Sequence, residues 1–179
     1  ATGVGSAGGV VFTNNTAPTT VGFTGSGTVT IEPRTTFTNA LISNYIFANT
    51  ISGFTWGKSS NVADLTVASP INIAGPIRMY GGNIALNANV SSSLVNAPLL
   101  FKASGDIAQT SNVALSSNGG DITLWANSDG DTTNYGGITL NTGASINSQN
   151  GNIILGGGTS LTTGYATRKT TNVGSTSNV

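Results

Sequence analysis

The sequence predicts an all-β protein built as a β-solenoid, and three observations predict this fold class. A strand unit recurs at a constant offset in the numbering, since Ile107 returns as Ile138 and Ile122 as Ile153; we call this the long repeat. Short segments alternate aliphatic and polar residues, which is typical of strands with one buried face. Glycine is abundant, with Gly 25 against Pro 5, which indicates many tight turns. A solenoid needs the constant offset because each aliphatic residue stacks on its equivalent in the next coil.

The expected strands follow one another along the chain, with aliphatic residues directed inward and Thr, Asn or Arg outward. Gly-Gly, Asn-Gly, Ser-Pro and Ala-Gly-Pro sequences lie between them and turn the chain, because glycine adopts positive φ and proline fixes φ. Only residues 37–48 have helix-like apolar spacing, but they also contain strand-favouring residues and lack a convincing cap. The expected strands are 28–31, 54–56, 65–67, 71–73, 77–79, 84–86, 99–101, 113–115, 122–124, 138–140 and 153–155.

The constant offset argues against a β-sandwich or an antiparallel barrel, whose strands also alternate but have no reason to repeat one unit at one spacing. A half-step is also present, since Ile122 lies almost midway between Ile107 and Ile138 in the sequence. The long repeat therefore fits either one wide coil with a loop or one and a half smaller coils, each coil advancing about 4.8 Å. Residues 125–135 are polar and rich in Asp, Asn and Gly, so we interpret them as a loop that leaves the coil.

We expect one domain over residues 1–179, with repeat coils over 34–179. Residues 1–33 are more irregular and fit either early coils of the same solenoid or a cap. The start has no initiating Met and no signal-peptide pattern, and neither end is marked as a terminus. We therefore expect a segment cut from a longer protein, with bare solenoid ends that associate. Apolar runs are too short to cross a bilayer, so no membrane insertion is expected.

The composition excludes several classes of function. Charged residues make up 7% of the chain, and six Lys and Arg balance six Asp and Glu. Nucleic acid is not an expected partner, because neutralising phosphates requires clustered Lys and Arg. Cys and His are both absent, which excludes disulfides, thiol nucleophiles, zinc sites and the usual proton shuttle at neutral pH. The low charge and the abundance of Ser, Thr and Asn are typical of secreted bacterial surface proteins.

Several motifs between residues 53 and 155 suggest a family. They include Gly-Phe-Thr-Trp-Gly-Lys, Ile-Ala-Gly-Pro-Ile, Tyr-Gly-Gly-Asn-Ile-Ala-Leu-Asn-Ala and Gly-Gly-Asp-Ile-Thr-Leu-Trp-Ala. This region, over half of the chain, resembles the repeat regions of very large filamentous haemagglutinin-like bacterial exoproteins. The resemblance implies a right-handed parallel β-helix, secreted across the outer membrane with a partner transporter and acting in adhesion, aggregation or biofilm. It also implies an extracellular or bacterial cell-surface location.

One loop concentrates oxygen ligands. The sequence Asn-Ser-Asp-Gly-Asp-Thr-Thr-Asn places Asn127, Asp129, Asp131 and Asn134 close together along the chain. Calcium takes about six to eight oxygen ligands, and an open polar loop can supply them. The full calcium-loop pattern is absent, however, and no Glu stands at its closing position. The loop is therefore predicted either to bind calcium, the one cofactor considered, or to form a solvated turn rich in Asx contacts.

Aromatic residues flank the same loop. Trp125 and Tyr135 stand on either side of it, and Trp56 and Tyr80 belong to earlier coils. Exposed rings beside Asn and Asp suit stacking on the faces of sugars, so Trp125 and Tyr135 are candidate sugar-binding residues. The alternative is that the rings pack over coil corners as large apolar side chains.

Paired carboxylates offer a route to catalysis. Asp106 and Asp121 begin corresponding strands, and glycosidases need two carboxylates across a groove. The same residues suit turn caps, since the next copy carries Gly137 and Asn152 in their places. We therefore predict a non-enzymatic, structural or adhesive segment of a bacterial surface filament. Its partners are expected to be neighbouring solenoid segments and host or cell-surface glycans, and the alternative is a carbohydrate-binding or polysaccharide-cleaving β-helix.

Overall fold

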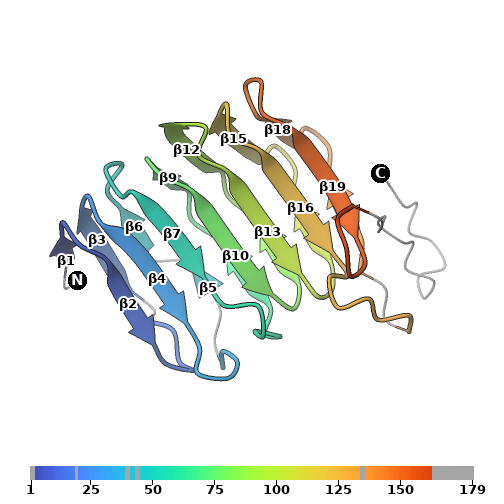
Figure 1. Ribbon diagram of the computed structural model, residues 1–179, viewed down its shortest axis with the longest axis horizontal. Helices are drawn as coiled ribbons and strands as arrows, with labels where there is room; N and C mark the ends of the chain where they lie inside the picture. The colour runs from blue at the N-terminus through green and yellow to red at the C-terminus, as the bar shows by residue number, and fades with distance from the viewer. Residues whose placement is uncertain (1–2, 19, 39–40, 43–44, 134–135, 163–179) are drawn as a thin grey trace.

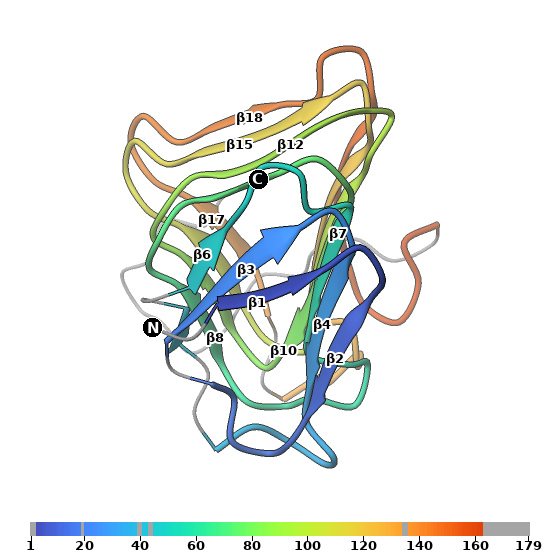
Figure 2. The ribbon, with the colours of Figure 1, turned by 90° about the vertical axis from the view of Figure 1, so that its left-hand side faces the viewer.

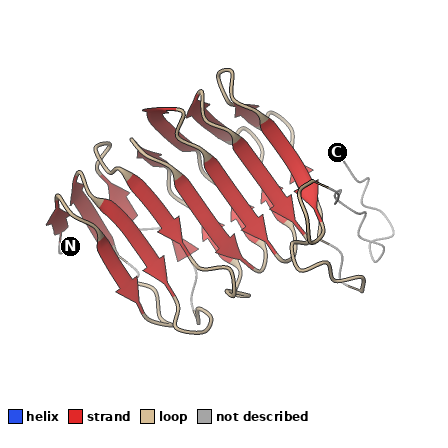
Figure 3. Cartoon of the chain, viewed as in Figure 1, coloured by secondary structure: helices blue, strands red, loops and turns tan. Residues whose placement is uncertain are grey.

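The computed structural model describes residues 3–18, 20–38, 41–42, 45–133 and 136–162, which form a β-solenoid of about five turns (Figure 1). Parallel strands stack along one axis, and the described residues contain no helix (Figure 3). Seen from the end that carries β1 (Gly3–Ser6), the chain runs clockwise as it recedes, so the coil is right-handed (Figure 2). The all-β, parallel solenoid expected from the sequence is confirmed.

Most strands are short, and they follow β1 in chain order. They are β2 (Val10–Thr13), β3 (Val21–Gly25), β4 (Thr28–Glu32), β5 (Leu41–Ile42), β6 (Tyr45–Phe47), β7 (Gly53–Trp56), β8 (Leu65–Val67), β9 (Ile71–Ile73), β10 (Ile77–Gly81), β11 (Ile84–Leu86), β12 (Val90–Val95), β13 (Leu99–Ala103), β14 (Ile107–Gln109), β15 (Ala114–Asn118), β16 (Ile122–Ala126), β17 (Ile138–Leu140), β18 (Ser145–Asn147) and β19 (Ile153–Gly157).

The strands form three walls around the core. A seven-stranded sheet in the order β19-β16-β13-β10-β7-β4-β2 faces the viewer in Figure 1. A five-stranded sheet in the order β17-β14-β11-β8-β5 forms the second wall. The third wall consists of a three-stranded sheet, β1-β3-β6, and a four-stranded sheet, β18-β15-β12-β9, with β6 in contact with β9. Each middle coil therefore contributes one strand to each wall before the chain passes to the next coil.

The strand register decides what the long repeat represents. Ile77 pairs with Leu99, Leu99 with Ile122, and Ile122 with Ile153. The first two of these steps are nearly equal, whereas the third is longer and equals the long repeat. The long repeat is therefore one coil, widened by the loop between β16 and β17. The half-step marks passage between walls, because Ile107 lies in the five-stranded sheet and Ile122 in the seven-stranded sheet.

Inward side chains of successive coils form one continuous core. In the seven-stranded sheet, Ile77, Leu99 and Ile122 are fully buried, and equivalent aliphatic residues are buried in the other walls. Aromatic rings fill the core nearer the N-terminal end, where the rings of Phe23 and Phe47 stack with centroids 5.2 Å apart. Burial of this apolar surface is the main force that holds the coils together.

The segment with helix-like spacing, residues 37–48, contains strands β5 and β6 and no helix in its described part. Phe37 is buried, and Tyr45 packs edge-on against Phe23 with ring centroids 5.9 Å apart. The Tyr45 hydroxyl donates to the carbonyl oxygen of Pro18, and burial raises the pKa of the Tyr45 phenol above its ordinary value. Aromatic and β-branched side chains suit a half-buried pleated strand, which explains why strand pairing prevails here.

Candidate functional site

Asp and Asn residues that precede the five-stranded sheet form a hydrogen-bonded series from coil to coil. Asp64 Oδ1 accepts from the backbone N–H of Asn83 at 2.8 Å and from its side-chain amide at 2.9 Å. Asn83 Oδ1 accepts from the backbone N–H of Asp106, and Asp106 Oδ1 from that of Gly137, each at 2.8 Å. We call these four residues the Asx ladder. Each acceptor satisfies a backbone donor at a corner, where the sheet pairing is interrupted.

Asp121 has the same role at a different corner. Its Oδ1 accepts from the backbone N–H of Asn152 at 2.8 Å and from the Asn152 amide at 3.0 Å. Asp121 precedes β16 of the seven-stranded sheet, whereas Asp106 precedes β14 of the five-stranded sheet. The structure thus gives both carboxylates a capping role at separate corners of the coil. The amide oxygen of Asn83 caps a corner in this way, so the Asn152 that stands in place of Asp121 in the next copy suits the same role.

The loop after β16 begins at a buried residue, Asn127, which adopts a left-handed backbone conformation with φ of 49°. Its N–H donates to the Gly105 carbonyl at 3.0 Å. Asp129 Oδ1 accepts from the Asp131 N–H at 3.1 Å, and Asp131 Oδ1 accepts from the N–H and hydroxyl of Thr133 at 2.8 and 2.7 Å. The two carboxylates therefore form successive Asx turns within the loop.

Calcium binding by this loop stays a prediction. In the described part of the chain, no three Asp, Glu, His or Cys side chains are grouped to hold a metal ion. Asn127 Oδ1 is buried and accepts no hydrogen bond from the described residues, so its side-chain oxygen is unsatisfied at the start of the loop. Asn134, the last of the predicted ligands, lies outside the described residues. Oxygen donors of this kind match calcium chemistry, but two carboxylates and one amide supply only part of a coordination shell.

The aromatic residues considered for sugar stacking have different surroundings. Trp56 is fully buried in the core, so the packing alternative holds for it. Trp125 is partly exposed on the outer face of the seven-stranded sheet, and its Nε1 donates to the Gly158 carbonyl at 2.7 Å. Tyr80 lies on the same face and is also partly exposed. Tyr135 lies outside the described residues.

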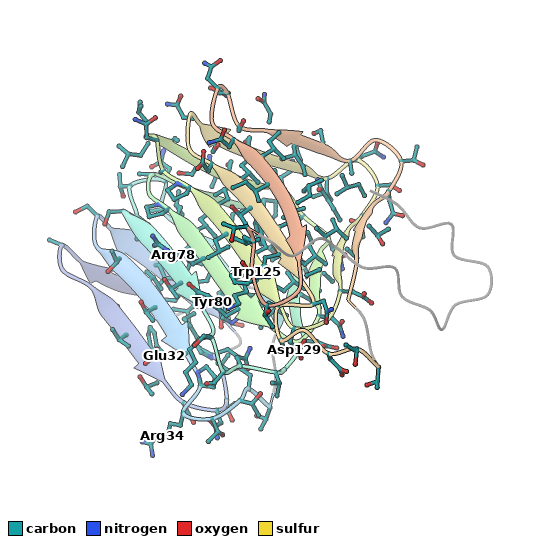
Figure 4. The ribbon with its side chains drawn as sticks, turned by 45° about the vertical axis from the view of Figure 1, so that its right-hand side comes forward. Glu32, Arg34, Arg78, Tyr80, Trp125 and Asp129 are labelled. Atoms are coloured by element: carbon teal, nitrogen blue, oxygen red, sulfur yellow. The ribbon has the colours of Figure 1, made fainter. Side chains whose placement is uncertain are left out.

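A row of outward side chains crosses β10, β13 and β16, and we call Tyr80, Lys102 and Trp125 the aromatic row. Figure 4 shows its two aromatic members, Tyr80 and Trp125. The register pairs Tyr80 with Lys102 and Lys102 with Trp125. The Lys102 ammonium lies 4.1 Å from the centroid of the Trp125 ring, which is a cation–π contact. Together with the bond from Trp125 to Gly158, this contact holds both side chains in place on the sheet.

A hollow opens beside the aromatic row, at the corner where strands of the seven-stranded sheet end. Figure 4 shows Tyr80, Trp125 and Asp129 on the same side of the molecule. The hollow combines an aromatic ring, an ammonium, a carboxylate and several hydroxyls, with the exposed side chain of Val62 at its edge. Its principal lining residues are Val62, Tyr80, Lys102, Ser104, Ser128 and Asp129.

The sequence indicated Trp125 and Asp129 as site residues but not the alignment of Trp125 with Tyr80 and Lys102. The signal lies in the spacing, because positions 80, 102 and 125 are separated by the same short steps as the buried residues of the middle coils. The long repeat conceals this shorter spacing, because the long repeat corresponds to the widened coil rather than to a middle coil. The structure thus brings Trp125 near a hollow that joins four coils.

A second hollow lies where the three-stranded and four-stranded sheets meet. Tyr45, Ile46 and Phe47 line it from β6, and Asn72 lines it from β9. The Ile46 side chain is 69% exposed, and the described lining residues carry no charge. This hollow therefore offers apolar contact but few groups that would fix the orientation of a ligand.

No family model, curated protein or solved structure matches this chain. Within the described residues, no helix has the length and apolar character needed to span a membrane.

Proposed function

We propose that this chain is a structural and adhesive segment of an extracellular bacterial surface filament, and that it is not an enzyme. The observation that supports this most is the continuous stack of coils around a single apolar core. Solenoids of this kind present extended surfaces rather than enclosed sites. The partners of the segment are neighbouring solenoid segments of the same filament and glycans of host or bacterial surfaces.

The dimensions of the stack support a role within a longer assembly. About five turns with a rise of about 4.8 Å each give a length of about 24 Å, so stiffness over a long distance requires further coils. Leu140 and Ile153 occupy inward register positions in the last described coil, yet they are 42% and 47% exposed. A further coil packed on this end would bury both side chains and add to stability.

The proposed location follows from the motifs of residues 53–155. Their resemblance to filamentous haemagglutinin-like exoproteins supports secretion to the cell surface, and the solenoid is compatible with such a repeat region. The use of Asp106 and Asp121 as corner caps supports a non-enzymatic role, because both carboxylates are occupied in structural hydrogen bonds.

An antibody raised against this chain tests the location. Immunogold labelling of intact producing cells and immunoblots of cell-surface and culture-fluid fractions are expected to detect the chain outside the cell. The product is expected to be much larger than the 17.9 kDa of this chain. Labelling that requires permeabilised cells and stays in the cytoplasmic fraction would contradict the proposal.

Adhesion is tested with latex beads coated with the purified chain and counted on host cells and on the producing bacteria. Beads coated with the folded chain are expected to attach, and beads coated with heat-unfolded chain or with an unrelated β-rich protein provide the controls. Equal attachment of all three kinds of bead would contradict an adhesive role.

A further inference from the structure

We infer that the hollow beside the aromatic row is a saccharide subsite, which binds an uncharged sugar unit of a polysaccharide. The inference rests on the proposed adhesive function, because it names the surface and the ligand class through which adhesion would occur. The observation that carries it is the convergence of Tyr80, Lys102 and Asp129, from three different coils, on one hollow.

Tyr80 supplies the stacking surface. Its ring is partly exposed at the edge of the hollow, on a strand that pairs with neighbours on both sides. The apolar C–H face of a sugar packs on an aromatic ring, while the tyrosine hydroxyl remains available for hydrogen bonding. Because the sheet fixes the position of Tyr80, binding does not require the backbone to become ordered, and less affinity is lost on association.

Lys102 supplies a positioned donor. Its ammonium is held against the Trp125 ring at 4.1 Å, and the Trp125 ring is held by its bond to Gly158. Trp125 therefore acts as a positioning residue for Lys102, two strand spacings or about 10 Å across the sheet from Tyr80. A long lysine side chain normally loses much rotamer freedom on binding, and the cation–π contact removes part of that cost in advance.

Asp129 supplies the matching acceptor. Sugar hydroxyls donate and accept at the same time, so adjacent hydroxyls can satisfy both a carboxylate and an ammonium. The hydroxyls of Ser104 and Ser128 add further donors and acceptors along the hollow. A few polar groups that converge beside an apolar surface are what fix the orientation of a small ligand.

The charges in the hollow favour an uncharged sugar. Its lining contains one cation, Lys102, and one anion, Asp129. An acidic sugar would meet repulsion from Asp129 as well as attraction to Lys102, and an amino sugar the reverse, so neither gains a net attraction to offset the loss of its hydration. An uncharged hexose or pentose unit meets no such repulsion and uses both groups.

The test is a binding measurement by biolayer interferometry with the full chain immobilised. The probes are three uncharged polysaccharides, galactomannan, xyloglucan and dextran, and one acidic polysaccharide, polygalacturonate. We expect binding of at least one uncharged probe with little response to polygalacturonate. Tryptophan fluorescence gives an independent readout of binding. Trp56 is fully buried, whereas Trp125 holds Lys102 at the hollow, so a change in fluorescence on binding is expected to come from Trp125.

Variants of the lining residues are compared with matched controls. Tyr80→Ala is expected to weaken binding about tenfold, Asp129→Asn about threefold to tenfold, and Tyr80→Phe only slightly. Leu100→Ala removes an apolar side chain from the same sheet outside the hollow, and Asp121→Asn makes the same charge change at another corner. Both controls are expected to bind like the unchanged chain, and thermal melting verifies that each variant is folded.

The possible results separate this inference from the proposed function. The subsite is supported if an uncharged probe binds the unchanged chain and this binding is lost in Tyr80→Ala. If Tyr80→Ala does not fold, loss of binding in Asp129→Asn supports the subsite instead. Binding confined to polygalacturonate, or unchanged in both variants, overturns it. If no probe binds but beads coated with the folded chain attach to cells, the subsite is rejected and the adhesive role is retained. If no probe binds and the beads do not attach, both the subsite and the adhesive role are rejected.

Discussion

Two strands of this solenoid share the tripeptide Ile-Thr-Leu but differ in burial. In β16, which belongs to the seven-stranded sheet, Ile122 and Leu124 are both fully buried. In β17, the last described strand of the five-stranded sheet, Ile138 is 4% exposed and Leu140 is 42% exposed. The difference arises because β16 lies between β13 and β19, whereas β17 has a described neighbour on one side only. Burial in a solenoid is therefore set by the adjacent coil as much as by the local pattern.

Truncation of the two leucines is expected to give the largest contrast. Leu124→Ala leaves a cavity in the closed core and should lower the free energy of unfolding by about 2–5 kcal/mol. Leu140→Ala removes a side chain that is already 42% exposed, so a loss of about 1 kcal/mol or less is expected. Urea unfolding followed by circular dichroism measures both values. Equal losses would contradict this account of burial at the end of the stack.

Two glycines extend the comparison to the corners. A Cβ added at Gly120 would lie 2.1 Å from the Ala97 carbonyl oxygen of the preceding coil, whereas one added at Gly137 would meet its nearest atom at 4.0 Å. Gly120→Ala should therefore destabilise the protein by about 1–3 kcal/mol. Gly137→Ala should be neutral or stabilise it by up to about 1 kcal/mol, because alanine has less freedom in the unfolded chain. The melting midpoints of the two variants measure this difference in stability. A midpoint for Gly137→Ala below that of the unchanged chain would contradict this account.

The Asx ladder links the middle coils to the widened coil. Asp106→Ala removes the acceptor for the Gly137 N–H and is expected to cost about 1 kcal/mol of unfolding free energy. Asp106→Asn keeps an acceptor oxygen in the same place and should retain most of that stability. Hydrogen exchange of the Gly137 amide is the specific readout. Protection that is unchanged in Asp106→Ala would mean that this hydrogen bond does not hold the corner.

The smallest expected effect concerns the loop that widens the coil. If Asp129 and Asp131 contribute to a calcium site with a dissociation constant of about 1 mM, then about 1 mM calcium should stabilise the fold by about 0.4 kcal/mol. The measurement is the melting midpoint with calcium and then with chelator, using Asp131→Asn as the control that should abolish the shift. A midpoint that stays constant up to ten times this concentration would leave the loop as a pair of Asx turns.

Much of the fold was predictable because alternation and repetition reflect the two forces that build a solenoid, apolar stacking and strand pairing. The expected strand 122–124 lies within β16, and the expected strand 138–140 coincides with β17. The coil length was harder to predict, since Ile77, Leu99 and Ile122 are aligned only by similar character, whereas the long repeat preserves near-identical sequence. Similarity between copies thus predicted the type of fold better than the number of residues in each coil.

The candidate site was predictable only in part, because it depends on which residues of different coils become neighbours. Trp125 was evident beside the polar loop, but its contact with Lys102 follows from a register that adjacent sequence does not reveal. Trp56 has the same aromatic character and is fully buried, because it falls on the inward parity of β7. Outward or inward placement thus depends on a one-residue shift in alternation.

The Asx ladder also gives the stack a direction. At each step the acceptor oxygen belongs to the earlier coil and the N–H donor to the later one, from Asp64 to Asn83, Asp106 and Gly137. Every bond of the ladder therefore points the same way along the stack axis, so the two ends of the stack are not equivalent at this corner. Stacks joined head to tail, the arrangement that continues the parallel strand pairing, keep this direction along the whole assembly. A fibre made from these units would therefore be polar, with chemically distinct growing ends.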